Sequence, residues 1–106
     1  MDLPWNLDAA SFDQLIGNDA VQLIDVRNRD ELPRVDELNA LCIPMNELKN
    51  AAHLLDRDKT IILFCHSGIR TLEALDILQE EFHLTRVCHL KGGLIQWLAY
   101  KSATAS

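Results

Sequence analysis

The sequence predicts an α/β fold built on a mostly parallel sheet. Apolar segments that suit strands alternate along the chain with segments whose apolar residues recur at helical spacing. One strand-like segment, Thr60–Phe64, is apolar on both faces, which is typical of a central strand in a parallel sheet covered on both sides. The chain has 106 residues, of which 48% are hydrophobic and 25% charged. This composition is typical of a globular domain that buries a core.

In the first half of the chain we expect two helices and two strands. Ser11-Phe12-Asp13-Gln14 has the pattern of a capping box, so a short helix is expected to begin there. Val21–Val26 predicts a strand, and Ala40–Ile43 predicts a shorter one that Pro44 ends. The second helix is expected to be capped by Asn46 and to run through Leu48, Ala52 and Leu55.

The second half predicts two more strands and two more helices. Thr60–Phe64 is the central strand, and a helix is expected from about Ile69 to Phe82, with an apolar face formed by Leu72, Leu75, Leu78 and Phe82. Arg86–Leu90 predicts another strand, after which Gly92-Gly93 turns the chain into a last helix that contains Trp97. We expect one domain over residues 1–101 and a loose tail over residues 102–106.

Charge and cysteine content narrow the classes of partner and compartment. The net charge of −6 argues against a nucleic acid or an anionic membrane as partner. Residues 1–58 carry a net charge of −7 and residues 59–106 a net charge of +1, so anion-binding chemistry is better sought in the second half. The longest apolar run, Ile61–Cys65, is far shorter than the ~18 residues of a membrane span, and we see no targeting leader. Three cysteines are a poor disulfide framework, and a cytoplasmic location is expected.

Residues of several chemical types gather in the segment that follows the most apolar strand, Cys65-His66-Ser67-Gly68-Ile69-Arg70-Thr71. In parallel sheets, ligands bind beyond the carboxyl ends of the strands. A cysteine there faces a helix N-terminus and a guanidinium, which both favour a thiolate. The free backbone N–H groups can converge on an anion, Gly68 permits a positive φ, and Arg70 can hold an oxyanion. We therefore expect Cys65 as a nucleophile, with the residues of the segment 66–71 binding the substrate.

In this segment and two others the chain resembles the rhodanese (sulfurtransferase) family. Members of that family carry Cys, four residues and then Arg, as Cys65 and Arg70 do here. Leu23-Ile24-Asp25-Val26-Arg27 is similar to the family's Asp-Val-Arg strand end, and the segment 90–97 matches its Leu-Lys-Gly-Gly-x-x-x-Trp run. One stretch departs from the family pattern: where a Gly-His-Ile-Pro-Gly-Ala motif is common, this chain has Val35-Asp36-Glu37-Leu38-Asn39-Ala40. Asn39 replaces a glycine there and can tolerate a left-handed conformation.

The resemblance implies a rhodanese-like three-layer α/β/α fold, with a mostly parallel central sheet of about five strands, and a persulfide mechanism. Cys65 would take a sulfane sulfur from a donor such as thiosulfate or a persulfide and pass it to a thiol, a sulfur-carrier protein or another nucleophile. Asp25 and Arg27 are interpreted as an ion pair that braces the active loop rather than as substrate ligands. No cofactor and no metal are expected, because adjacent strand residues point to opposite faces and Cys65-His66 and Cys88-His89 can hardly form a zinc site.

Several alternatives stay open at the level of sequence. Arg70 could pair with Glu73 or a backbone carbonyl instead of an anion, and His66 could be an exposed loop residue. Cys42 and Cys88 are interpreted as buried apolar residues, with a resolving thiol as the alternative. A catalytically idle binding module is a second candidate function. A cysteine phosphatase is a third, although that class has five residues between Cys and Arg instead of four. The sequence leaves the oligomeric state open.

Overall fold

A five-stranded sheet, parallel throughout, forms the centre of the computed structural model, which describes residues 3–105. The strands are β1 (Asn6–Leu7), β2 (Val21–Asp25), β3 (Leu41–Cys42), β4 (Thr60–Phe64) and β5 (Val87–Leu90). Their order is β1-β5-β4-β2-β3, and all four pairings are parallel. The predicted α/β class with a parallel sheet is therefore confirmed, and β4 lies at its centre, where its apolar residues are buried on both faces.

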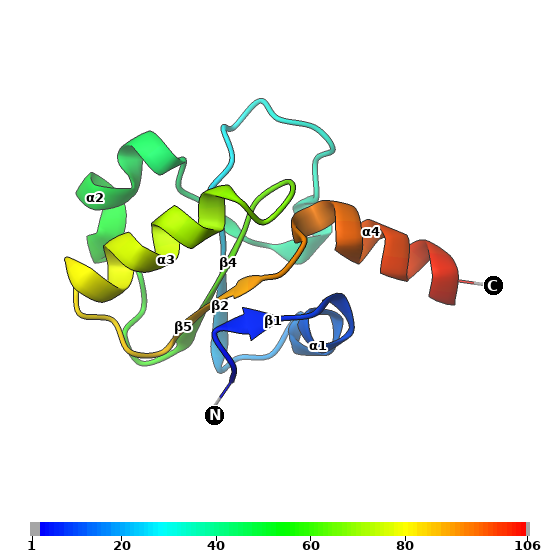
Figure 1. Ribbon diagram of the computed structural model, residues 1–106, viewed down its shortest axis with the longest axis horizontal. Helices are drawn as coiled ribbons and strands as arrows, with labels where there is room; N and C mark the ends of the chain where they lie inside the picture. Colours follow the sequence, from blue (N-terminus) through cyan, green and yellow to red (C-terminus); the bar gives the residue numbers. More distant parts are fainter. Residues whose placement is uncertain (1–2, 106) are drawn as a thin grey trace.

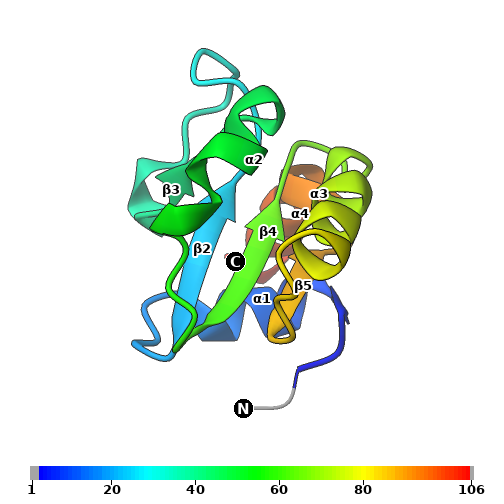
Figure 2. The ribbon, with the colours of Figure 1, turned by 90° about the vertical axis from the view of Figure 1, so that its left-hand side faces the viewer.

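Helices cover the sheet on both sides, which makes the three-layer arrangement visible in Figures 1 and 2. On one face lie α2 (Leu48–Ala51) and α3 (Arg70–Glu80), and on the other lie α1 (Ala9–Leu15) and α4 (Gly93–Thr104). Each face has its own apolar cluster, one containing Leu48 and Leu78 and the other containing Phe12 and Trp97. None of the helices in the described part of the chain has the length and apolar character needed to cross a membrane.

Three elements of the first half differ from the sequence prediction. The first helix begins at Ala9, because the carboxylate of Asp8 accepts a 2.8 Å hydrogen bond from the N–H of Ser11 and so caps it. Strand β1 was not predicted. The helix expected after Asn46 is broken into a 3-10 turn at Met45–Glu47, the short α2, and a second 3-10 turn at Ala52–Leu54.

The stretch that departs from the family pattern forms a 3-10 turn, Asp36–Leu38, in which Leu38 is buried, as is the preceding residue Val35. Asn39 ends the turn at φ 51°, in the left-handed conformation that asparagine can tolerate in place of a glycine. At the other end of the chain, α4 continues through Thr104, and residues 102–104, expected as a loose tail, are helical. The segment contains no Gly or Pro to end the helix. Ala105 follows the helix, and residue 106 lies outside the described residues.

Candidate active site

Cys65 lies directly after β4, at the carboxyl edge of the sheet, and its side chain is fully buried. The backbone N–H of Gly68 donates a hydrogen bond to its sulfur over 3.1 Å. Gly68 has φ +87°, and a Cβ at this position would lie 2.9 Å from the backbone N of Gly92. The loop therefore curls around the sulfur as expected, and both the positive φ and the close approach require glycine at position 68.

The N-terminus of α4 lies beside the same loop and supports it (Figure 1). The N–H of Leu94 donates to the carbonyl of Cys65 over 2.9 Å, and the N–H of Ile95 donates to the carbonyl of His66 over 3.1 Å. These two amides of the first helical turn have no partner inside α4, so they are free to bind the loop. Gly93 lies at the contact, with φ +66°, and a Cβ there would be 2.5 Å from the carbonyl oxygen of His66.

Arg70 binds Glu31, a residue of the loop between β2 and β3, rather than Glu73. Its two terminal nitrogens lie 2.6 and 2.8 Å from the two carboxylate oxygens of Glu31. The carboxylate also accepts a 2.7 Å hydrogen bond from the N–H of Asn28. The hydrogen bonds from Arg70, followed by that from Asn28, lower the pKa of Glu31 to about 2. The pKa of Arg70 is raised, chiefly by Glu31 and further by the sulfur of Cys65.

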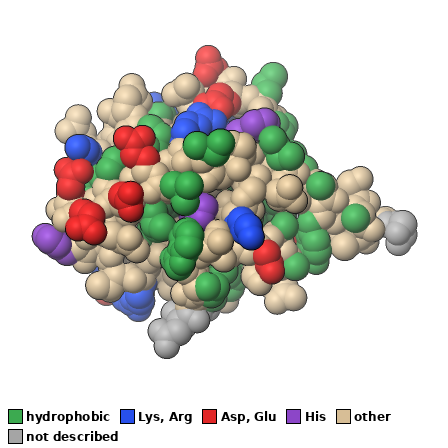
Figure 3. Space-filling view, in the orientation of Figure 1, with side chains coloured by type: hydrophobic (Ala, Val, Ile, Leu, Met, Phe, Trp, Pro, Cys, Tyr) green, Lys and Arg blue, Asp and Glu red, His purple; other side chains and the backbone are tan. Residues whose placement is uncertain are grey.

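Asp25 and Arg27 form the expected ion pair at the end of β2, with an N–O distance of 3.0 Å between two buried side chains. Nη1 of Arg27 also donates to the carbonyl of Pro33 over 3.0 Å. The pair thus holds the loop that carries Glu31, and Glu31 in turn holds Arg70. Figure 3 shows acidic, basic and histidine side chains gathered at the upper edge of the molecule, over the loops that follow β2 and β4.

The remaining loop residues differ in exposure. His66 is half-buried, Ser67 is exposed, and Ile69 is 73% exposed, whereas Thr71 is fully buried. The hydroxyl oxygen of Thr71 lies 3.9 Å from the sulfur of Cys65 and 2.7 Å from Nδ1 of His89 on β5.

Sequence reasoning missed Glu31 and His89 as members of this cluster. The only signal for His89 was a polar ring within the otherwise apolar strand β5. For Glu31 there was none, because its partner lies 39 residues further along the chain.

The other two cysteines do not join the site. Cys88 is buried on β5, and burial raises the pKa of its thiol to about 12. Cys42 is half-buried, donates to the carbonyl of Arg27 over 3.5 Å, and has a pKa raised by burial and by Asp25. Both therefore stay protonated at neutral pH. Within residues 3–105, no group of three or more His, Cys, Asp and Glu side chains is placed to hold a metal ion.

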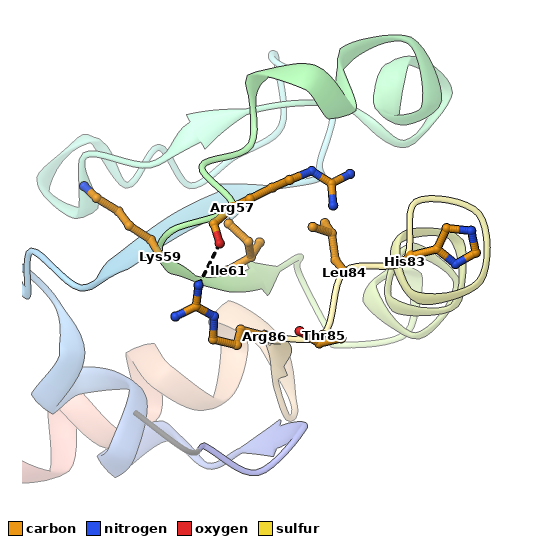
Figure 4. Close-up of a pocket in the computed structure, with 7 residues that line it drawn as sticks. All are labelled: Arg57, Lys59, Ile61, His83, Leu84, Thr85 and Arg86. Carbon is orange, nitrogen blue, oxygen red and sulfur yellow. Dashed lines mark hydrogen bonds between the residues drawn. The ribbon is translucent and has the colours of Figure 1, made fainter.

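A basic pocket lies at the opposite end of β4 from Cys65, lined by Arg57, Lys59, Ile61, His83, Leu84, Thr85 and Arg86. In Figure 4 the side chains of Arg57 and Lys59 point away from each other, and His83 lies apart from both. One terminal nitrogen of Arg86 already donates to the carbonyl of Arg57, and one of Arg57 to the carbonyl of Phe82. These cations do not converge on a common point, so this pocket offers no clear anion site. The candidate site is therefore the cluster around Cys65.

Comparisons with known proteins show the family of this chain. The family model for the rhodanese-like domain matches residues 8–100. A sulfurtransferase of Allochromatium vinosum is 29% identical over 92 residues, covering 86% of this chain and 85% of that protein. A putative sulfurtransferase of Bacillus subtilis is 28% identical and covers 84% of each chain. A rhodanese-related protein from Thermoplasma volcanium superposes with a TM-score of 0.77 at 26% identity, over 92% of this chain and 93% of that one. The chain therefore belongs to the rhodanese-like domain family.

Proposed function

We propose that this protein is a sulfurtransferase in which Cys65 carries the transferred sulfur as a persulfide. The single observation that carries the proposal is the cradle around Cys65, where the N–H of Gly68 points at a buried sulfur over 3.1 Å. A backbone donor fixed at this distance stabilises a negatively charged sulfur without reorganising during the reaction. The sulfurtransferase names of the two relatives support the same activity.

The proposed reaction is a double displacement. The Cys65 thiolate attacks the outer sulfur of thiosulfate, or the sulfane sulfur of a persulfide. A new S–S bond forms, and the old one breaks. With thiosulfate, sulfite leaves with the electron pair, and Cys65 becomes a persulfide anion. An acceptor thiolate, free or on a sulfur-carrier protein, then attacks the outer sulfur of this persulfide and restores the Cys65 thiolate.

Arg70 and the ion pair of Asp25 and Arg27 have separate roles in this proposal. Arg70 supplies positive charge at the mouth of the loop, where an anionic donor arrives and its anionic remainder departs. Asp25 and Arg27 act further away, because they hold the loop that contains Glu31. The residues of the segment 66–69 would supply the backbone that surrounds the donor. The three free cysteines fit a reducing, cytoplasmic compartment.

The test is the intact mass of the protein after incubation with thiosulfate and removal of the small molecules. We expect a gain of one sulfur atom in the wild type and in the variants Cys42→Ser and Cys88→Ser. The thiols that these two variants lose stay protonated at neutral pH in the wild type, so they are not expected to take up the sulfur. Cys65→Ser should gain none, because a hydroxyl cannot form a persulfide. A sulfur atom retained by Cys65→Ser would contradict the assignment of the nucleophile.

Two further outcomes distinguish the other candidate functions. Failure of the wild type to load sulfur from thiosulfate and from a small persulfide would favour an idle binding module. Hydrolysis of an aryl phosphate that depends on Cys65, with no persulfide formed, would favour a phosphatase. We expect no such hydrolysis, because the four-residue spacing closes a tighter ring of amides than the phosphatase class has.

A further inference from the structure

A buried chain of three polar groups leads from the reactive sulfur to the strand behind it. Cys65 lies 3.9 Å from the hydroxyl of Thr71, and this hydroxyl lies 2.7 Å from Nδ1 of His89. Cys65 and Thr71 are fully buried, and His89 is only 3% exposed. The three side chains come from three elements: the end of β4, the first turn of α3, and β5.

His89 is held so that one ring nitrogen faces Thr71 and the other faces no polar group. Among the described residues, Nε2 of His89 has no hydrogen-bond partner. The indole of Trp5 stacks on the ring, with centroids 5.5 Å apart and planes 4° from parallel, and the backbone N–H of His89 donates to the carbonyl of Trp5, which holds Trp5 beside the ring. The ring therefore cannot rotate freely to find another partner for Nε2.

The position of the ring proton decides what the Thr71 hydroxyl can do. With the proton on Nε2, a buried N–H donor is left without an acceptor, and such orphaned donors are rare in folded proteins. Nδ1 would then accept the hydroxyl proton, and the hydroxyl oxygen could only accept from a Cys65 thiol. With the proton on Nδ1, the ring donates to the hydroxyl oxygen. The hydroxyl proton is then free to point at the sulfur of Cys65.

We propose that His89 is a positioning residue, which donates from Nδ1 to Thr71 so that the Thr71 hydroxyl donates to the anionic sulfur of Cys65. The inference rests on the proposed function only in that the sulfur passes through thiolate and persulfide anions. Together with the N–H of Gly68, the hydroxyl would give this anion a second donor. No proton is transferred to His89 in this arrangement, and the ring stays neutral.

The electrostatic surroundings agree with a neutral ring. Burial lowers the pKa of His89, and no charged side chain contributes to the shift. The neighbouring elements present Trp5 ahead of β1, Leu63 on β4 and Thr71 on α3, none of which carries a charge. Near the sulfur itself, the charged groups are Arg70 and, bound to it, Glu31, and the titratable neighbour in the loop is His66.

The experiment follows the alkylation of Cys65 by iodoacetamide as a function of pH, read from the mass of the peptide that contains Cys65. In Thr71→Val and His89→Leu we expect the midpoint of the profile to rise by about one pH unit, which corresponds to about tenfold slower alkylation below the midpoint. Thr71→Ser keeps the hydroxyl, and His89→Asn keeps a donor near the place of Nδ1. Both should therefore stay close to the wild type.

Two controls separate positioning from folding. Thr60→Val removes another buried hydroxyl from the far end of β4 and should leave the profile unchanged. His89→Gln serves as a second variant should His89→Leu fail to fold, because its amide reaches the place of Nε2 rather than Nδ1. It should behave as His89→Leu does.

An unchanged profile in a folded His89→Leu or His89→Gln, or a profile in His89→Asn shifted as far as theirs, would overturn the proposal. Alkylation needs no sulfur donor, so this result is independent of sulfur loading. Loading that fails in the wild type, beside the expected shifts in alkylation, would count against the proposed function alone.

Discussion

Arg70 has its two terminal nitrogens bound to a carboxylate, so its charge is shared between Glu31 and any anion that enters the loop. The Arg70 side chain is 37% exposed and the Glu31 side chain 26%, which places the pair at the mouth of the site rather than in its interior. An anionic donor has to approach Arg70 in the presence of a permanently charged Glu31, whose pKa is about 2. Glu31 thus balances part of the positive charge of Arg70, in place of the Glu73 that the sequence offered as a partner.

Replacement of Arg70 by alanine should slow sulfur loading from thiosulfate at least about tenfold, the effect of losing one charge-assisted interaction of ~1.5–3 kcal/mol. Arg70→Lys should recover only part of the rate, because an ammonium group cannot reproduce the paired geometry. Initial loading rates over a range of thiosulfate concentrations measure both effects.

The double variant Arg70→Ala with Glu31→Ala identifies the cause of the loss. If Arg70 binds the donor, the double variant should load as slowly as Arg70→Ala alone. Recovery of the wild-type rate in the double variant would show that the single substitution acts by leaving the charge of Glu31 unpaired.

At the scale of elements, the active loop depends on α4 as much as on β4 and α3. The first turn of α4 donates two hydrogen bonds to the carbonyls of Cys65 and His66, and Gly93 allows the close approach that these bonds require. The position of Cys65 therefore depends on a segment that lies about thirty residues later in the chain.

Gly93→Ala should both destabilise the protein and disturb the loop. Its Cβ would lie 2.5 to 2.7 Å from backbone atoms of His66 and Cys65, which cannot move aside cheaply. Gly17→Ala is the matched control, because Gly17 also has a positive φ, +82°, but open space around it. We expect Gly17→Ala to cost about 1–2 kcal/mol from backbone strain and Gly93→Ala about 1–3 kcal/mol more. Urea denaturation measures the difference, and equal costs for the two variants would contradict the proposed contact.

The strands and helices that the sequence predicted best are those with long apolar patterns. Thr60–Phe64 was predicted with its bounds, because five consecutive buried positions leave a clear signal. Strand β1 was missed, because two residues are too few for a period and their pairing with β5 is a tertiary contact. The residues of the candidate site also differ in how far the sequence predicts them. The loop from Cys65 to Thr71 was predicted as one contiguous motif, whereas Glu31 and His89 join it only through the fold.

At the scale of the whole molecule, the charge pair at the mouth of the site also makes stability depend on pH. The pKa of Glu31 falls from an ordinary value of 4.5 to about 2 in the folded protein, so folding favours the charged carboxylate. Its contribution to stability is present in full above about pH 4.5 and is lost as the pH falls toward about 2.

Glu31→Gln should therefore lower the free energy of unfolding at neutral pH, by about 1 kcal/mol for a partly exposed pair. The difference from the wild type should shrink as the pH falls below about 4.5. Urea denaturation at a series of pH values measures this. Glu47→Gln is the control, because Glu47 pairs with Arg29 where both side chains are more exposed, and its effect should be smaller. A difference between Glu31→Gln and the wild type that grows toward acid pH would contradict this account.

The pairing of β1 with β5 sets the order in which a newly made chain can complete its structure. Asn6 pairs with His89, and Leu7 with Leu90, so the first strand to be synthesised waits for the last one before it can join the sheet. The amides of α4 that bind the loop around Cys65 are made later still. Cys65 therefore leaves the ribosome before the segment that binds its loop does. During that interval, the fold does not yet shield the sulfur on which the proposed activity depends.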